Sequence, residues 1–480
     1  MEGALWLLCL FFLFLALLCC FLLSYKMRRI SSGPKLPPGS MGLPFLGETF
    51  KLYSQNPNVF FADRQKRYGD VFKTHIHGSP CVMLTCAEAA RFVLVTKARL
   101  FRPSYPRSKE RLIGPWAIFY QSGGFHGRLR KVVQSNVSLD AAKKMIPAIE
   151  VLAISTLESC CYNGGVIQTF HEMKKFAFEV AVLAAFGQLD SERKEKLMKN
   201  FFTLDKGYNC LPFNIPGCRY HRALMARKRI GEVIMDILRE RREKRLAQKN
   251  FLSSLLSYRD ENGGVLTDDQ IVDNIAGILF AAQDTTASSI TWCIKYIHDN
   301  AEIRQTIKVE QKAIHEANGK GKRPLTWAQT RNMPYTHKVV METLRMASTI
   351  SYTYREASED VEYNGFLIPK GWKVLPLFWI IHHNPHFFVD PDKFVPSRFK
   401  VAQKPNTFMP FGNGVHTCPG NDLAKLLILI MIHHFVNKFR CEVVGPNEGV
   451  QYDPFPVPKD GLLARFMKES NGEEAAVELS

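Results

Sequence analysis

A chain of 480 residues, 46% of them hydrophobic, can bury a sizeable core, which excludes disorder over most of its length. Its 63 Lys and Arg residues outnumber 45 Asp and Glu residues, so an acidic protein, an anionic membrane surface or an acidic small molecule are reasonable partners. Nucleic acid is disfavoured, because the positive charges are scattered and no zinc-finger, RNA-binding or basic-zipper signature is present.

The N-terminal end of the chain has the composition of a membrane span. Ala4 to Leu23 is an unbroken apolar run, which as a helix would be about 30 Å long, the thickness of one bilayer core. A cleaved secretory signal prefers a basic start, whereas here Glu2 precedes the run and basic residues follow it as far as Arg29. We therefore expect residues 1–30 to be a single-pass anchor with a basic flank, which places the remaining chain in the cytosol, at the endoplasmic reticulum membrane.

The next segments alternate between extended and helical character. Residues 31–50 are rich in proline, which forbids a helix and favours a stiff hinge. Val71 to Thr85 contains β-branched, partly alternating residues around a Gly-Ser-Pro turn and predicts a hairpin. Helical signals dominate from about Phe125 to Leu344. The longest predicted helix begins at Asp268, after Thr267 and with carboxylates in its first turn, and ends at about Asp299.

Strand character returns between Thr353 and Leu377, where Asn-Gly and Pro-Lys-Gly punctuate the pattern. A last strong helix is predicted after Cys418, and residues 469–480 form an acidic tail with the composition of a disordered segment. We predict a mainly α protein with small β-sheets, in which residues 51–468 form one domain behind the anchor and hinge.

The stretch FMPFGNGVHTCPG, Phe408 to Gly420, places Cys418 among glycines and prolines. A reactive thiol, a metal or haem ligand and an inert buried cysteine are all compatible with one cysteine in such a loop. Gly412, Gly414 and Gly420 permit close backbone approaches, which suits a loop that fits against something flat. The following helix brings free N–H groups and a positive helix end near the sulfur, which favours a thiolate.

FGNGVHTCPG resembles the haem-binding loop of the cytochrome P450 family, FxxGxRxCxG. Phe411, Gly414, Cys418 and Gly420 match this pattern, and His416 stands where the family has arginine. The resemblance implies the cytochrome P450 fold and a haem b cofactor, whose iron the Cys418 thiolate would ligate; such ligation favours O–O cleavage.

Two further segments resemble the family's structural network. In METLR, Glu342 and Arg345 stand three residues apart on one predicted helix face and can pair. DKFVPSRF resembles the segment that contributes a second arginine, here Arg398. An unpaired buried charge costs several kcal/mol, so we expect this network to serve folding around the haem and not the chemistry.

FAAQDTTASS lies in the middle of the longest predicted helix. Asp284 and Thr285 are poor residues for a buried helix, because their side chains compete for backbone hydrogen bonds. The resemblance implies an acid–alcohol pair across the haem from the cysteine, at a locally opened helix turn. There the alcohol would hydrogen-bond dioxygen and the pair would help to relay protons, which makes both residues catalytic candidates.

Haem also carries two propionates, which require donors. HGRLR resembles the family's WxxxR helix, with His126 in place of tryptophan and Arg130 retained, and TYREASED offers Arg355 on a strand. His126 and His416 are additional candidates, since imidazole can donate to a carboxylate, although a surface histidine remains the alternative for both.

Several stretches, among them SKERLIGPWAIF and IPKGWKVLPLFWIIHH, resemble the plant abscisic acid 8'-hydroxylases. This implies hydroxylation of the 8'-methyl of abscisic acid with dioxygen and electrons from NADPH. NADPH-cytochrome P450 reductase would deliver these electrons, and the product would cyclise to phaseic acid. The pocket-lining segments then include Phe101 to Phe125, with Lys109 or Arg111 as a donor to the substrate carboxylate.

Three other functions remain open on the sequence. The first is hydroxylation of another plant terpenoid, such as a brassinosteroid or gibberellin precursor. The second is an isomerase or dehydratase with the same fold that needs no external electrons. The third is a haem-containing binding protein without catalysis, which is disfavoured because none of the motifs is broken.

Overall fold

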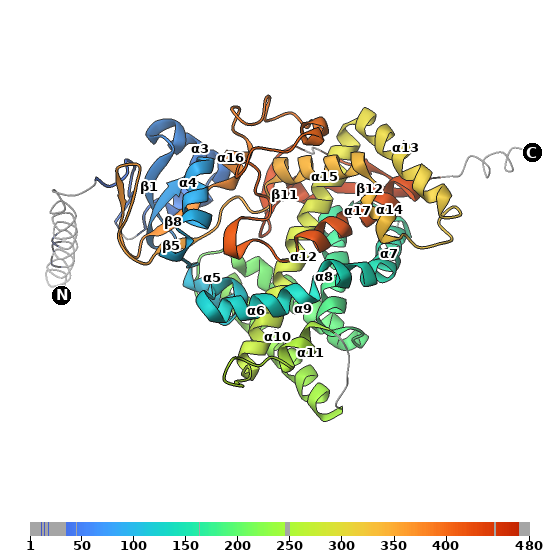
Figure 1. The fold of residues 1–480 in the computed structure, drawn as a ribbon, viewed down its shortest axis with the longest axis horizontal. Coiled ribbons are helices and arrows are strands. Elements are labelled where there is room, and N and C mark those ends of the chain that lie inside the picture. Colours follow the sequence, from blue (N-terminus) through green and yellow to red (C-terminus); the bar gives the residue numbers. More distant parts are fainter. Residues whose placement is uncertain are drawn as a thin grey trace, which may run out of the picture. The chain divides into compact units, whose positions relative to one another are not determined.

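The computed structural model describes residues 11, 14, 18, 35–44, 46–162, 164–244, 250–445 and 448–469. The described residues fall into two compact units (Figure 1). Residues up to 104 and residues 353–377 belong to the smaller unit, and residues 105–352 with those from 378 onward belong to the larger unit.

The smaller unit contains a five-stranded sheet in the order β1 (Val71–Ile76), β2 (Ser79–Leu84), β8 (Lys373–Pro376), β5 (Arg355–Ala357), β3 (Phe101–Pro103). The predicted hairpin is confirmed, because β1 and β2 pair antiparallel. Its turn lies at His77 and Gly78, which both have positive φ, whereas Ser79 and Pro80, expected in the turn, pair within β2. β8 continues the sheet in parallel to β2, and β5 and β3 follow antiparallel. The other elements are α2 (Thr49–Tyr53), α3 (Pro57–Tyr68), α4 (Ala87–Arg91), η1 (Phe92–Thr96), η2 (Ala98–Leu100) and the pair β6 (Val361–Tyr363) and β7 (Phe366–Ile368).

Part of the predicted hinge pairs with this unit. Lys35 forms a parallel bridge with Phe366, and Gly39 forms one with Lys73. A Cβ at Gly39 would lie 2.1 Å from the carbonyl oxygen of Lys73, and its φ is 142°, so this approach requires glycine. The proline-rich stretch therefore contacts the smaller unit along part of its length and is more than a spacer.

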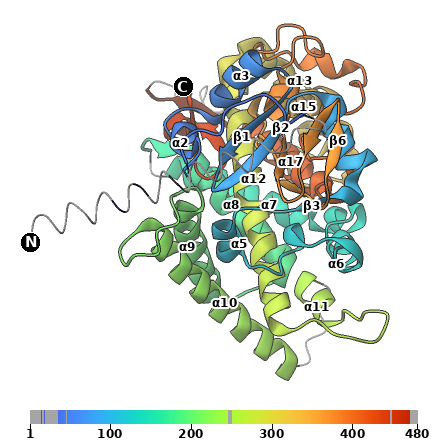
Figure 2. The same cartoon turned by 90° about the vertical axis from the view of Figure 1, so that its left-hand side faces the viewer.

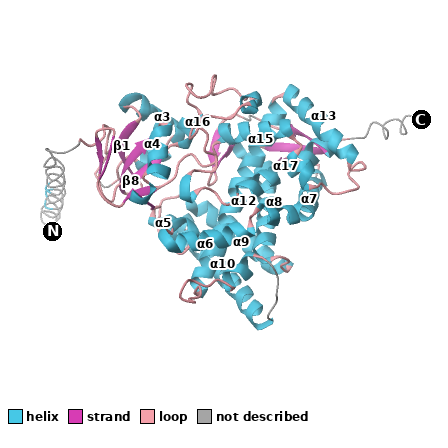
Figure 3. Cartoon of the chain, in the orientation of Figure 1, coloured by secondary structure: helices cyan, strands magenta, loops and turns pink. Residues whose placement is uncertain are grey.

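The larger unit is mainly helical (Figure 3). Its helices are α5 (Arg107–Ile113), α6 (Gly123–Asn136), α7 (Leu139–Tyr162), α8 (Thr169–Phe186), α9 (Ser191–Tyr208), α10 (Arg219–Lys244), α11 (Phe251–Leu256), α12 (Asp268–Asp299), α13 (Ala301–Ala317), α14 (Trp327–Arg331), α15 (Pro334–Ala347), α16 (Phe378–His382) and α17 (Asn421–Lys438). Short 3-10 turns are η3 (Ile118–Tyr120), η4 (Pro396–Lys400), η5 (Gly414–His416) and η6 (Lys459–Gly461). Two small sheets complete the unit, β4 (Ile167–Gln168) with β12 (Leu463–Lys468) and β9 (Phe439–Val443), and β10 (Val450–Tyr452) with β11 (Pro456–Pro458).

Helix α12 has the bounds predicted from the sequence. It begins with a capping box, in which the Thr267 side chain accepts from the N–H of Gln270 and the Gln270 side chain accepts from the N–H of Thr267. Its sides pack on α8, α15 and α17, while α9 and α10 run side by side (Figure 2). The apolar core divides into one cluster around α7, α8 and α17 and another around α9, α10 and α11, and α12 contributes to both.

The predicted anchor lies outside the described residues except for Phe11, Phe14 and Leu18, which are helical and exposed. In the described part of the chain, one helix is long and apolar enough to cross a membrane, namely α7. Its Ile149 and Leu157 are fully buried in the core of the larger unit, so α7 is a core helix. The tail from residue 470 also lies outside the described residues.

Candidate active site

The loop before α17 is closed by hydrogen bonds that set the position of Cys418. The N–H of Cys418 donates to the carbonyl of Phe411 at 2.8 Å. The N–H and the hydroxyl of Thr417 both donate to the carbonyl of Gly414, at 3.0 and 2.6 Å. Gly412 and Gly414 have φ of 73° and 70°, a left-handed conformation that favours glycine. These contacts place Cys418 directly before the start of α17.

Cys418 is exposed, although neighbouring protein atoms partly desolvate its thiol. Desolvation raises its pKa, while a hydrogen bond from the backbone of Gly420 and the charge of Arg130 act in the opposite direction. We expected the N–H groups at the helix end to favour a thiolate; the Gly420 contact does so, but desolvation outweighs it. A metal ion bound to the sulfur would deprotonate it outright.

Three predicted haem contacts gather beside this loop. The rings of His126 and His416 are 4.2 Å apart between centroids. His126 is buried on α6, so the surface alternative does not hold for it, and Arg130 follows it by one helical turn. Arg355 belongs to β5 of the smaller unit, where its guanidinium donates to the carbonyl of Tyr354 at 2.8 Å.

Thr285 lies in a regular stretch of α12. Its hydroxyl donates to the carbonyl of Ala281 at 2.6 Å, and the hydroxyl of Ser289 donates to the carbonyl of Thr285 at 2.8 Å. The sequence predicted an opened turn at this place. All residues of α12 are described, and the helix is α-helical throughout, so the opened turn is not observed.

Asp284 takes part in a buried group of charges that the sequence analysis missed. The Lys174 ammonium lies 2.6 Å from a carboxylate oxygen of Asp284 and 2.6 Å from one of Asp205. The Gln283 side chain donates to both carboxylates, at 3.0 and 2.8 Å. These residues come from α8, α9 and α12, and a signal for them was available, because Lys174 and Asp205 interrupt otherwise apolar helix faces.

Two carboxylates share one ammonium in this group. Desolvation raises the pKa of Asp284 and of Asp205, and Lys174 opposes the shift at both. Desolvation also disfavours the charged form of Lys174, but the carboxylates outweigh it and raise the pKa of the ammonium. The raised pKa values of Asp284, Asp205 and Lys174 are consistent with one arrangement, in which the ammonium stays charged and the two carboxyls share a proton.

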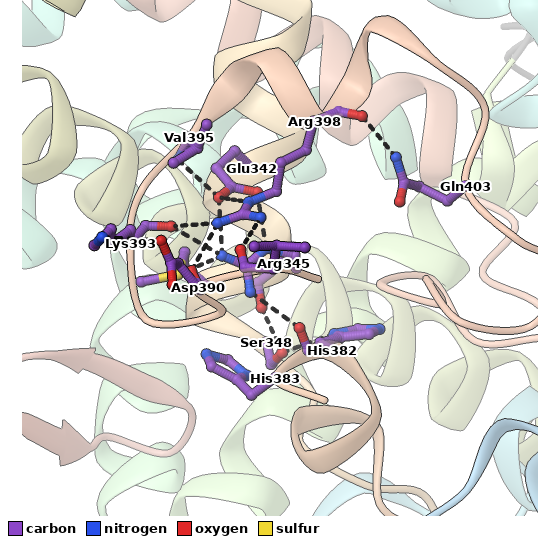
Figure 4. Close-up of polar contacts among 12 residues, drawn as sticks. Glu342, Arg345, Ser348, His382, His383, Asp390, Lys393, Val395, Arg398 and Gln403 are labelled. Carbon is purple, nitrogen blue, oxygen red and sulfur yellow. Dashed lines mark hydrogen bonds and ion pairs between the residues drawn. The ribbon is translucent and has the colours of Figure 1, made fainter. Parts of the chain in front are cut away.

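The predicted pairing of Glu342 with two arginines is confirmed (Figure 4). Arg345 donates twice to Glu342, at 2.8 Å each, and Arg398 donates at 3.2 Å. The N–H of Val395 donates to the same carboxylate at 2.9 Å. Glu342 and Arg345 are fully buried, so each charge depends on its partners.

His382, which the sequence analysis did not assign a role, connects this network to the cysteine loop. Arg345 donates to the His382 carbonyl at 3.0 Å. The hydroxyl of Ser348 donates to the Arg345 carbonyl, so it accepts from Nδ1–H of His382 at 2.8 Å. Nε2 of His382 then accepts from the N–H of Met409 at 2.9 Å. Burial holds the pKa of His382 well below its usual value, which agrees with a neutral ring.

Comparisons with known proteins agree with this arrangement. Residues 37–461 match the family Cytochrome P450. The chain is 58% identical to abscisic acid 8'-hydroxylase 4 of Arabidopsis thaliana, covering 98% of this chain and 100% of that protein. It is 59% identical to abscisic acid 8'-hydroxylase CYP707A1 of Solanum lycopersicum, covering 91% and 92%. Among solved structures, retinoic acid bound cyanobacterial CYP120A1 is 27% identical with a TM-score of 0.84, covering 91% of this chain and 100% of that one.

The chain therefore belongs to the cytochrome P450 family. It is a cytochrome P450 monooxygenase, with the mainly helical fold of that family.

The family implies a haem-thiolate cofactor, and the residues of the larger unit fit one. The Cys418 sulfur is accessible, and desolvation disfavours its anionic form unless a cation binds it. Arg130, His126 and His416 supply possible donors for anionic groups beside the loop.

Proposed function

We propose that this monooxygenase hydroxylates the 8'-methyl group of abscisic acid, using dioxygen and electrons derived from NADPH. The observation that carries the proposal is the similarity to proteins named abscisic acid 8'-hydroxylase. Members from Arabidopsis, tomato and rice are 50–59% identical to this chain over more than nine-tenths of its length. The hydroxylated product would cyclise to phaseic acid, so the reaction removes the hormone.

The cofactor of this reaction would be haem b, whose iron the Cys418 thiolate would bind. Phe411, Gly414 and Gly420 shape the loop that presents the sulfur. In the larger unit, His126, Arg130 and His416 would donate to the propionates, and Arg355 of the smaller unit stays a candidate donor by resemblance alone. When bound, the haem supplies oxygen activation, which a thiolate ligand promotes.

Asp284 and Thr285 handle protons in this reaction. The Thr285 hydroxyl holds a proton that is now donated to the Ala281 carbonyl, and rotation about its χ1 would redirect that proton. Asp284 follows Phe280 by one helical turn, and its raised pKa allows the carboxyl to hold a proton closer to neutral pH. Lys174 fixes the position of Asp284 through their ion pair.

Electron delivery and localisation complete the proposal. NADPH-cytochrome P450 reductase is the electron donor, and residues 1–30 anchor the enzyme in the endoplasmic reticulum membrane with its catalytic domain in the cytosol. The apolar run with its basic C-terminal flank supports this placement.

Full-length protein in microsomes with the reductase tests the proposal. Its reduced carbon monoxide adduct should show the red-shifted Soret band of thiolate ligation, and Cys418→Ser should lose that band. Abscisic acid with NADPH should yield phaseic acid. If thiolate ligation is present but abscisic acid is not turned over, and a brassinosteroid or gibberellin precursor is, then that precursor is the substrate and not abscisic acid. Turnover without NADPH would show an isomerase.

A further inference from the structure

Lys109, on α5 of the larger unit, contacts a neutral amide and an aromatic ring. Its ammonium donates to Oδ1 of Asn209 at 3.1 Å and lies 4.3 Å from the ring centroid of Tyr208. Among the described residues, no carboxylate forms an ion pair with it. A buried ammonium normally has an anionic partner, because burial without one disfavours its charge.

Lys109 and Tyr208 are both only partly exposed. The side chain retains some accessible surface, yet desolvation lowers its pKa to about 8. Tyr208 likewise retains accessible surface although it is enclosed closely enough for burial to raise its pKa.

Asn209 holds the ammonium in a defined orientation. Its Nδ2 donates to the carbonyl of Pro454 at 2.6 Å, which fixes the amide so that Oδ1 accepts from Lys109. An ammonium has three N–H donors, and Asn209 uses one of them. The ring of Tyr208 attracts the cation without satisfying the other donors. The remaining N–H groups of the Lys109 ammonium can therefore donate to an anionic oxygen.

Aromatic rings connect this cation to the catalytic segment of α12. The ring of Tyr208 lies 4.8 Å from that of Phe280, and Phe280 lies 6.2 Å from Phe455. Phe280 is followed by Ala281, whose carbonyl accepts from the catalytic candidate Thr285. A ligand with an apolar body and one anionic end could place its body along these rings and its anion at Lys109.

We propose that Lys109 binds the carboxylate of the substrate, and that Asn209 and Tyr208 position its ammonium. This inference rests on the proposed function, since abscisic acid combines an apolar ring with a carboxylate. It also separates the two candidates from the sequence, because Arg111 on the same helix is exposed. The enzyme thereby selects terpenoid carboxylic acids over neutral terpenoids of similar shape.

The test measures the spin-state change of the full-length holoenzyme on titration with abscisic acid and with its uncharged methyl ester. Lys109→Gln keeps a donor for Asn209 and removes the charge. We expect it to weaken binding of the acid by about 10- to 100-fold, because a hydrogen bond between charged groups changes the affinity by about this factor. Binding of the ester should change by less than about threefold. Lys109→Arg should restore part of the affinity for the acid.

Arg111→Gln is the matched control, because it removes a neighbouring exposed charge from the same helix, and it should leave both affinities unchanged. Equal losses for acid and ester in Lys109→Gln, or unchanged binding of the acid, would overturn the inference. If the wild-type enzyme bound no abscisic acid, the proposed function would fail. The same comparison with a gibberellin-precursor acid and its methyl ester would then decide the role of Lys109 by itself.

Discussion

The imidazole rings of His126 and His416 lie against one another, 4.2 Å apart between centroids. These are the two positions at which the sequence departs from the family's pattern of tryptophan in the WxxxR helix and arginine in the haem loop. The structure shows that the two departures are in contact. A change at either position therefore alters the surroundings of the other, between α6 and the cysteine loop.

This contact predicts coupled effects on haem retention. His416→Arg should still bind haem, because an arginine retains a donor at that place. His126→Trp alone should destabilise the protein by about 1–3 kcal/mol, since a larger ring enters a buried site. The double variant should regain part of that loss. The melting temperature and the carbon monoxide spectrum measure both effects, and strictly additive changes would show that the two positions are independent.

The buried group of charges predicts different outcomes for Asp284 and Asp205, the two carboxyls that pair with Lys174. Asp284→Asn leaves one ammonium with one carboxylate, so the protein should fold and bind haem while turnover falls by about 100-fold. Asp205→Asn makes the same change in charge without removing the proposed proton carrier. A rate loss in Asp205→Asn as large as that in Asp284→Asn would exclude a specific role for Asp284.

Lys174→Met should act on folding, because it leaves two buried carboxyl groups, which share one proton, without a counter-ion. We expect a loss of about 3–5 kcal/mol in the free energy of unfolding. Asp140→Asn, which removes a partner from the exposed pair with Lys143, is the control and should change stability by less than about 1 kcal/mol. Urea unfolding followed by circular dichroism gives both values, and comparable values would mean that the buried group is not needed for stability.

Buried neutral histidines predict destabilisation by acid. Burial lowers the pKa of His382 well below its usual value and that of His383 to about 4. In the unfolded chain these rings bind protons below about pH 6.5, whereas in the folded protein they do not. Unfolding then takes up protons, so stability should fall as the pH drops below 6.5, by up to about 1.4 kcal/mol per pH unit for each ring.

Thermal unfolding between pH 4.5 and 7.5 measures this slope. His383→Phe should reduce it, since the variant removes one proton acceptor and keeps an aromatic ring beside Trp379. The exposed His386 supplies the control, and His386→Gln should leave the slope as it is. A slope that does not change in His383→Phe would assign the acid sensitivity to other groups.

Features encoded over short distances were predictable from the sequence. The start of α12 follows from Thr267 and the carboxylates after it, and the hairpin of β1 and β2 follows from its β-branched segments on either side of Gly78. The pairing of Glu342 and Arg345 needs only one helical turn. Family resemblance added Arg398, which no local pattern could have joined to them.

Contacts between distant segments were not predictable in this way. Lys174 and Asp205 meet Asp284 only because α8 and α9 pack beside α12, and the sequence contains no rule for that register. The preference for Lys109 as donor to the substrate carboxylate depends on its contact with Asn209, which Pro454 holds in place. These residues are distant in the sequence. The expectation of an opened turn in α12 was wrong for this structure, because the Thr285 hydroxyl donates to the Ala281 carbonyl within a regular helix.

The link through His382 also has a consequence for the order of folding. Glu342 must find Val395 and Arg398 at sequence separations of 53 and 56 residues before its hydrogen bonds are complete, and His382 bonds to Met409 across 27 residues. Contacts across such separations cost loop-closure entropy that local helical contacts do not. The helices should therefore form first and the cysteine loop last, so that haem capture is a late event on the folding pathway.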